Sequence, residues 1–153
     1  MKKSFKAFVI GVFLLSLLFS FCTAFAAANV IKIDGISAPI PDGMGQIRER
    51  DDRTFVPLRF VSEFLKNQVW YMEDTKTACI ESSDILILVQ DGNQLLTSVS
   101  KLDGSSKHTE MDTAAYIEPT EGRMYLPIRF LAEAIGYTVG WDEATQTVTI
   151  DKK

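Results

Sequence analysis

The sequence contains a single histidine and only two cysteines in 153 residues. One imidazole excludes a metal centre held by several histidines of this chain. If residues 1–26 are removed from the mature protein, Cys79 is the only thiol left; an internal disulfide is then excluded and stability must come from an apolar core. Cys79 is expected to be a small, half-buried strand residue, with an intermolecular disulfide as the alternative.

Positive charge is also scarce, with 16 Lys+Arg against 20 Asp+Glu. Residues 1–26 hold three of the lysines and no acidic residue, so the remaining chain has 13 basic and 20 acidic side chains. Nucleic-acid binding requires a basic surface and is therefore excluded as a function. The same negative balance disfavours purely electrostatic adhesion to anionic lipids or anionic wall polymers. Hydrophobic residues at 46% and charged residues at 24% are typical of a globular chain.

Only one long hydrophobic run is present, from Ala7 to Phe21. Lysines precede it and small residues, including two Ala-x-Ala triplets, follow it, which predicts a signal peptide over residues 1–26. The protein is thus expected to be exported, and either secreted or associated with the cell envelope. The run is shorter than the roughly 20 residues that span a bilayer, so an uncleaved anchor is the second alternative. Lipidation at Cys22 is a third, disfavoured because the bulky Phe21 precedes that cysteine.

The rest of the chain contains an internal repeat at an offset of 70 residues, which holds without a gap from Arg53/Arg123 to Ile80/Ile150. We interpret it as a duplication. Identical residues recur at Arg53/Arg123, Pro57/Pro127, Arg59/Arg129, Phe60/Phe130, Glu63/Glu133, Val69/Val139, Glu73/Glu143, Thr75/Thr145, Thr77/Thr147 and Ile80/Ile150.

Each copy has the same local pattern. A β-favouring pair leads into Pro57 or Pro127, and proline suits the first turn of a helix. Apolar residues then follow helical spacing, and an alternating strand follows at residues 77–80 and 147–150. We therefore predict an α+β fold of two tandem ββαβ-type repeats, each with one short helix, in mainly antiparallel sheets. The repeats are assigned to residues 29–98 and 99–153 and are expected to pack as one globular unit.

Several connecting segments carry their own signals. Asp-Gly pairs at residues 34–35, 91–92 and 103–104 predict tight turns, and the apolar run at residues 85–89 predicts a central, covered strand. Residues 42–52 are expected to be a solvent loop, and residues 104–110 a polar, mobile connection. A last strand ending at Ile150-Asp151 would leave a free sheet edge, through which the chain is expected to associate with itself or with another protein.

The repeated element resembles the copper amine oxidase N-terminal-like domain, also called a stalk domain, of exported bacterial proteins. The second copy matches best, with Arg123, the run Leu126-Pro127-Ile128-Arg129-Phe130, Gly136, Trp141-Asp142 and the strand at residues 147–150. The first copy has Tyr71-Met72 where the family pattern has Trp-Asp. In complete amine oxidases the similar domain is a non-catalytic appendage, so the resemblance implies an architecture and no activity.

Enzyme chemistry finds little support in the sequence. Copper amine oxidases need copper held by three imidazoles, and His108 in a polar stretch is the only histidine, so we predict no enzyme and no cofactor. A serine triad would also need His108 as its base, and no nucleophile-elbow, zinc-protease or phosphate-loop motif is present. A glycosidase-like carboxylate pair is the least supported alternative, because carboxylate separation cannot be read from sequence.

Two residue sets remain as candidates. The first set is a structural signature in which an arginine and a glutamate lie four residues apart on each helix; its members are Pro57, Arg59, Phe60, Glu63, Pro127, Arg129, Phe130 and Glu133. The alternative is that the arginines bind a ligand. Trp70, Tyr71, Tyr137 and Trp141 are interpreted as packing residues, with a saccharide- or peptide-stacking platform as the alternative. The function expected is a non-catalytic binding or spacing module whose cell-wall or protein partner is unknown; the alternative is a ligand-binding protein for wall saccharide or peptide.

Overall fold

The computed structural model describes residues 30–153, which form thirteen strands and two helices. The predicted signal peptide and Cys22 lie outside these residues. The α+β class, the two short helices and the mainly antiparallel pairing are confirmed. The elements are β1 Val30–Ile33, β2 Ile36–Ser37, β3 Arg48–Arg50, β4 Arg53–Pro57, α2 Leu58–Phe64, β5 Gln68–Met72, β6 Thr77–Glu81, β7 Ile85–Gln90, β8 Leu95–Ser100, β9 Ser106–Glu110, β10 Tyr116–Glu118, β11 Arg123–Pro127, α3 Ile128–Ala134, β12 Tyr137–Asp142 and β13 Thr147–Lys152.

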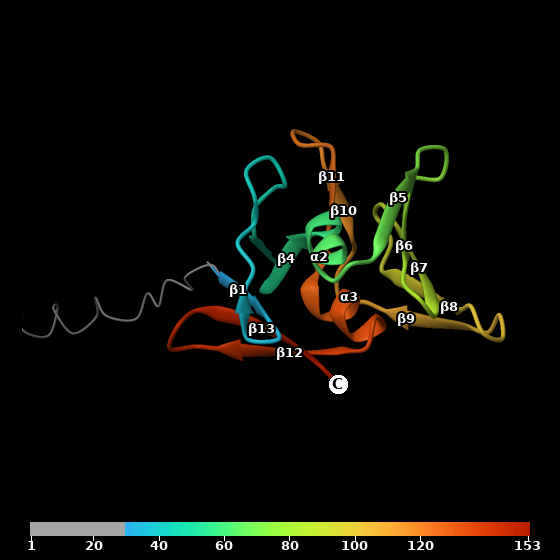
Figure 1. The fold of residues 1–153 in the computed structure, drawn as a ribbon. Coiled ribbons are helices and arrows are strands. Elements are labelled where there is room, and N and C mark those ends of the chain that lie inside the picture. The colour runs from blue at the N-terminus through green and yellow to red at the C-terminus, as the bar shows by residue number, and fades with distance from the viewer. Residues whose placement is uncertain (1–29) are drawn as a thin grey trace, which may run out of the picture.

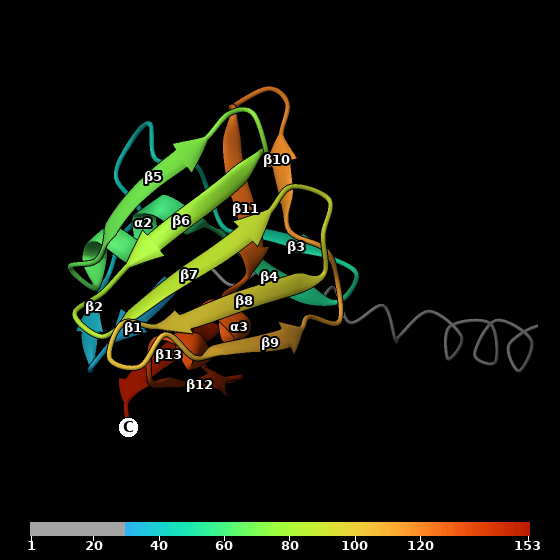
Figure 2. The same cartoon turned by 90° about the vertical axis from the view of Figure 1, so that its right-hand side faces the viewer.

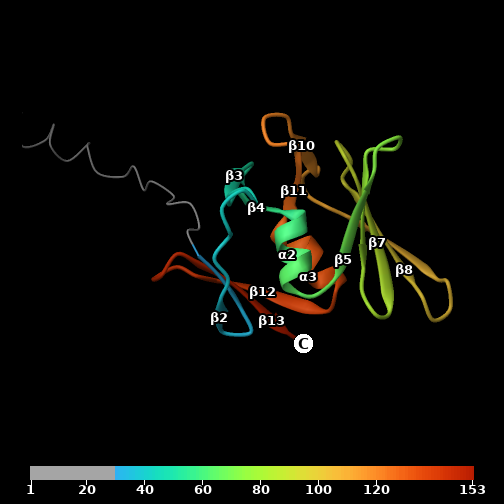
Figure 3. The same cartoon turned by 45° about the horizontal axis from the view of Figure 1, so that its top comes forward.

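Three sheets surround the two helices, which lie in the middle of the molecule (Figure 1). The strand orders are β12-β13-β1-β2, β10-β11-β4-β3 and β5-β6-β7-β8-β9. Figure 2 shows the five-stranded sheet face-on, with the helices behind it. Its middle strand is β7, as predicted from the apolar run at residues 85–89. Figure 3 shows α2 and α3 between this sheet and the other two.

A strand leads through a proline into each helix, as the sequence predicted. Pro57 and Pro127 adopt φ of −61° and precede α2 and α3. Two residues beyond the end of each helix the backbone adopts a positive φ, 61° at Lys66 and 89° at Gly136. Glycine adopts this conformation without strain, whereas lysine does so at a cost of about 1 kcal/mol. The first copy therefore stops its helix with a less favourable residue.

The predicted ββαβ pattern lacks one strand. Each helix is preceded by a hairpin and followed by another, which gives β3-β4-α2-β5-β6 and β10-β11-α3-β12-β13. The strand that the predicted pattern omits after each helix is β5 in the first copy and β12 in the second, and these strands carry the candidate aromatic residues. In β5 exposed and half-buried residues alternate, as in a strand with one covered face. The sequence did not show this alternation, because large side chains occur on both faces of the strand. The boundary proposed between residues 98 and 99 falls within β8 and stays a prediction.

The middle sheet joins the two strand–helix segments through β4 and β11, which are antiparallel. Val56 lies opposite Leu126, while Phe55 faces Pro127 and Tyr125 faces Pro57. Val56 therefore pairs with the residue that corresponds to it at the offset of 70. On either side of this pair, the phenylalanine or tyrosine of one strand pairs with the proline of the other. The first strand, β1, pairs in parallel with the last, β13, and this is the one parallel pairing between described strands.

Three expectations about loops and edges are wrong. The predicted loop at residues 42–52 contains β3, and the predicted mobile connection at residues 104–110 contains β9, because polar strands at a sheet edge lack the apolar alternation used to find strands. The last strand, ending near Ile150-Asp151, is not a sheet edge: β13 is paired on one side with β12 and on the other with β1. The edges of that sheet are β12 and β2.

One hydrophobic core connects all three sheets with both helices. Fully buried members include Ile31 of β1, Val61 of α2, Ile87 of β7, Leu126 of β11 and Leu131 of α3. Because the chain has no disulfide among its described residues, this core provides the main stabilisation of the fold. Neither of the two described helices is long or apolar enough to cross a membrane.

Candidate functional site

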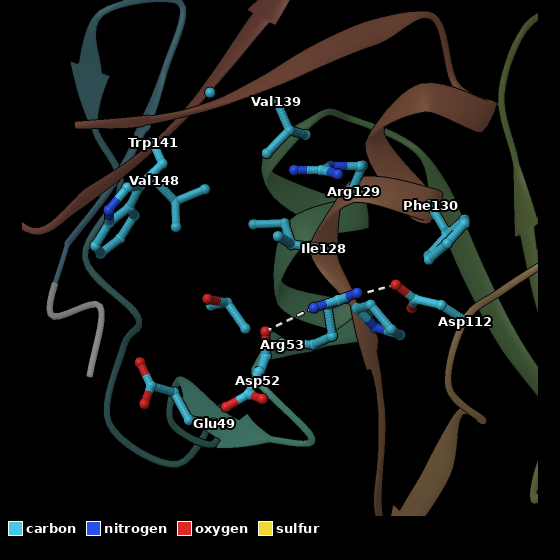
Figure 4. A pocket seen from close by; sticks show the side chains of 13 residues that line it. Glu49, Asp52, Arg53, Asp112, Ile128, Arg129, Phe130, Val139, Trp141 and Val148 are labelled. Carbon is cyan, nitrogen blue, oxygen red and sulfur yellow. Dashed lines mark hydrogen bonds and ion pairs between the residues drawn. The ribbon is translucent and has the colours of Figure 1, made fainter. Parts of the chain in front are cut away.

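A groove of about 330 Å³ lies between β12, the start of α3 and the β3-β4 hairpin; we call it the β12 groove (Figure 4). Ile128, Val139 and Val148 form its apolar wall, and Trp141 stands at one end. Figure 4 shows the Arg129 guanidinium between Val139 and Ile128, with Glu49 and Asp52 on the opposite side of the cavity. The β12 groove thus combines an apolar wall, an aromatic face and charges of both signs.

A larger groove of about 850 Å³, which we call the β5 groove, lies between β5, the start of α2 and the β10-β11 hairpin. Its wall is formed by Leu58, Val69 and Ala78, and the aromatic residues are Trp70 and Tyr71. Charged residues of both signs also line it: Arg59, Lys76 and Arg123 against Glu73, Asp91 and Glu121.

The two grooves are built from residues that correspond at the offset of 70. Both contain the proline before the helix, the first two helical residues, a valine and an aromatic residue of the following hairpin, and an arginine from the other strand–helix segment. The corresponding pairs are Pro127/Pro57, Ile128/Leu58, Arg129/Arg59, Val139/Val69, Trp141/Tyr71 and Arg53/Arg123.

Arg53 and Arg123 each reach across to the opposite half of the chain. The Nε of Arg53 donates to Asp112 Oδ2 at 2.5 Å, and a second guanidinium nitrogen donates to the carbonyl of Asp52 at 3.0 Å. Arg123 donates to the carbonyls of Gly43 and Glu121. Arg53 and Arg123 are identical residues at corresponding positions of the repeat, which was the one indication in the sequence that they share a role. In the structure that role is to link distant segments beside the two grooves.

A polar cluster supports one wall of the β5 groove. Glu121 accepts hydrogen bonds from Tyr125 Oη at 2.7 Å and from Arg48 at 2.5 Å, and these bonds lower the pKa of its carboxyl group. The Arg48 guanidinium lies 5.3 Å from the centroid of the Tyr125 ring, a favourable cation–π distance. Gly45 packs so closely that a Cβ there would lie 2.5 Å from Tyr125 Oη. Sequence reasoning missed this cluster because its members come from separate segments.

The four candidate aromatic residues do not share one site. Trp141 lines the β12 groove, with 42% of its surface exposed, while Trp70 and Tyr71 line the β5 groove. Tyr137 lies outside both grooves and packs, half-buried, against the core. Whether these residues contact a ligand stays a prediction.

The repeat signature divides between core and surface. Pro57 and Pro127 are buried, as is Phe60, whereas Phe130 is half-buried beside the β12 groove. Arg59 and Glu63 form a loose, exposed ion pair at 4.0 Å, which contributes only a few tenths of a kcal/mol. Arg129 and Glu133 are exposed, and Arg129 makes no ion pair or hydrogen bond with residues 30–153.

Neither His108 nor Cys79 lines either of the two grooves. His108 lies on β9, where Thr97 Oγ1 and His108 Nδ1 are 3.0 Å apart, so it is a strand residue and not part of a loop. Cys79 lies in a strand as expected, but it is fully buried in β6 rather than half-buried. Burial raises the pKa of its thiol, which makes it a poor nucleophile. Residues 30–153 contain no group of three or more His, Cys, Asp or Glu placed to hold a metal ion.

The family described as the copper amine oxidase N-terminal domain matches this chain over residues 32–150. The chain belongs to that family. The match spans both strand–helix segments and both grooves, and the N-terminal domain of this family is a non-catalytic stalk domain. No curated protein and no solved structure matches the chain.

The copper in the family's name does not fit the donor set of this domain. A copper(II) site of the oxidase type needs several imidazoles, and the described residues provide one, exposed on β9 and bonded to Thr97. The candidate site of this chain is the pair of grooves.

Proposed function

We propose that this chain is an exported, non-catalytic binding or spacing module of the cell envelope or extracellular space. The observation that carries the proposal is the matched pair of grooves, each with an apolar wall and an exposed or half-exposed aromatic residue, in a domain of a non-catalytic family. Such concave, partly apolar surfaces with a few polar groups are suited to recognition.

Export is proposed from the sequence of residues 1–26. A mature mass that corresponds to a chain beginning after residue 26, measured on protein recovered outside the cytoplasm, is the expected result. A full-length product retained in the cytoplasm would contradict export. A lipid-modified product that begins at Cys22 would instead identify a lipoprotein.

A duplication is proposed as the origin of the two grooves. It is supported by the offset of 70 residues, by the recurrence of the hairpin–helix–hairpin order, and by the exchange of corresponding positions across β4 and β11. Under this proposal each groove is composite, because its arginine at the hairpin, Arg53 or Arg123, comes from the other copy.

The second candidate is a ligand-binding protein for wall saccharide or peptide, favoured by the exposure of Trp141 and Trp70 beside carboxylates. Aromatic faces stack on sugars and on peptide side chains. Unlike a spacing role, the second candidate requires the aromatic residues of the grooves to contact a ligand, which a binding experiment can decide.

The test is co-sedimentation with purified peptidoglycan, comparing wild type with Trp141→Ala and with Leu102→Ala. Leu102 is 85% exposed and lies outside both grooves, so it provides the matched surface control. Reduced sedimentation of Trp141→Ala alone is expected for the ligand-binding candidate. Equal sedimentation of all three proteins, or of none, would remove the aromatic platform and leave the spacing role.

A further inference from the structure

Each groove is bordered by a strand at the edge of a sheet. β12 pairs only with β13, and β5 pairs only with β6, among the strands that the structure describes. An edge strand presents backbone N–H and C=O groups that an extended polypeptide can satisfy by adding a further strand. The two edges lie at corresponding places, since Val139 and Val69 occupy matching positions in the grooves.

Beside each edge stands an arginine of the adjoining helix. Arg129 has no charged or hydrogen-bonding partner among residues 30–153, and Figure 4 shows its guanidinium directed into the β12 groove beside Val139. Arg59 has only the loose pair with Glu63 at 4.0 Å. A guanidinium against apolar walls favours a carboxylate, which it can bind through two parallel hydrogen bonds.

We propose that each groove binds an extended polypeptide segment, which adds as a strand to β12 or β5 and places an acidic side chain on Arg129 or Arg59. The inference rests on the proposed binding function and names its ligand class. A saccharide is disfavoured because it lacks the regular backbone donors and acceptors that an edge strand pairs. Because the grooves share six pairs of corresponding residues, including the two helical arginines, one molecule would bind two such segments.

The chain provides one fluorescent reporter for each groove. It contains two tryptophans, Trp141 in the β12 groove and Trp70 in the β5 groove. In Trp70→Phe protein the remaining fluorescence reports on the β12 groove, and in Trp141→Phe protein it reports on the β5 groove. Each groove can therefore be titrated by itself in the intact domain.

The probe is a synthetic peptide of alternating threonine and valine, long enough to span β12, with one central glutamate. Three comparison probes differ in one property each: the glutamate replaced by lysine, the backbone N-methylated at every residue so that both edges of the strand are blocked, and an oligogalacturonate that carries carboxylates without a peptide backbone. N-methylation removes backbone donors and so prevents strand addition while leaving the carboxylate in place.

The glutamate peptide is expected to perturb both tryptophans, and the lysine and N-methylated peptides to bind at least tenfold more weakly. Arg129→Ala is expected to weaken binding about tenfold in the β12 groove alone, and Arg59→Ala in the β5 groove alone. Arg50→Ala is the control, an exposed arginine of β3 outside both grooves.

Equal binding of the N-methylated peptide, tighter binding of the oligogalacturonate, or no binding of the glutamate peptide would overturn the inference. The proposed function would still stand if peptidoglycan sedimentation depended on Trp141. Conversely, peptide binding without peptidoglycan sedimentation would support the inference and exclude the cell wall as the ligand. Circular dichroism melts of each variant separate lost binding from lost folding.

Discussion

At the scale of single residues, the charged groups of this protein serve two different roles. Arg53, Arg123 and Arg48 are held by carboxylates or carbonyls from distant segments, so they join parts of the fold. Arg59 and Arg129 are exposed at the grooves and are held weakly or by no described residue. The first group is expected to affect folding when it is altered, and the second to affect binding.

Glu121→Gln is expected to reduce the dependence of stability on pH. The bonds from Tyr125 and Arg48 lower the pKa of the Glu121 carboxyl group below its ordinary value of 4.5, so the unfolded chain binds a proton before the folded chain does. Glu121 therefore stabilises the fold above about pH 4.5, and this contribution is lost as pH falls through the lowered pKa. The measurement is the melting temperature of wild type and variant from neutral pH to about pH 3.

The gap between the two proteins should be largest at neutral pH and should narrow on acidification. Glu110→Gln provides the control, because Glu110 is an exposed glutamate of β9 and its curve should follow that of wild type. A gap that stays constant over this range would contradict the assigned role of Glu121.

At the scale of elements, the strands at the centre of each sheet differ sharply from those at its edge. In the sheet of order β12-β13-β1-β2, β13 contributes fully buried Ile150, whereas Ile36 of the edge strand β2 is 66% exposed. The alternation at residues 147–150 predicted a strand with one buried face, but it could not show that both sides of β13 are paired.

Ile150→Ala is expected to lower the free energy of unfolding by about 2–4 kcal/mol, because it leaves a cavity in the shared core. Ile36→Ala makes the same chemical change at an exposed position and should alter the free energy by less than about 0.5 kcal/mol. Urea denaturation of both variants measures the difference. Similar losses at the two positions would contradict the central placement of β13.

At the scale of the whole molecule, the first and last described strands join the two halves of the chain. β1 pairs in parallel with β13, the N–H of Asp34 donates to the carbonyl of Ile150 at 2.8 Å, and Asp34 Oδ1 accepts from the N–H of Lys152 at 2.9 Å. The middle sheet adds a second junction between β4 and β11. Each half thus lacks strands that the other provides.

Residues 30–98 and residues 99–153, produced separately, are therefore expected to show no cooperative thermal transition, because each leaves apolar strand faces and strand edges without partners. The intact chain of residues 30–153 is the reference. Circular dichroism melts of each half, and of their equimolar mixture, test this expectation. A cooperative melt of either half alone would show that the repeat is an independent folding unit.

Local signals in the sequence were sufficient for several elements. The prolines before α2 and α3, the Asp-Gly turns and the apolar strand β7 were all predicted, because each depends on the conformational preference of a few adjacent residues. The edge strands β3 and β9 were missed because polar residues in a strand look the same as polar residues in a loop. Trp70, Tyr71 and Trp141 were identified as candidates, but their separation into two grooves was not foreseen.

By itself, the sequence determined the class of the protein: two helices set by prolines, the strand at residues 147–150 from its period-two alternation, β7 from its apolar run, a family pattern over residues 32–150, and too few histidines for oxidase chemistry. Only the tertiary structure decided that β1 lies beside β13, that Arg53 and Arg123 each complete the groove of the opposite segment, and that β5 and β12 are edges beside those grooves. The physical reason is range: helix starts and turns depend on neighbouring residues, whereas strand partners depend on which distant apolar faces bury one another.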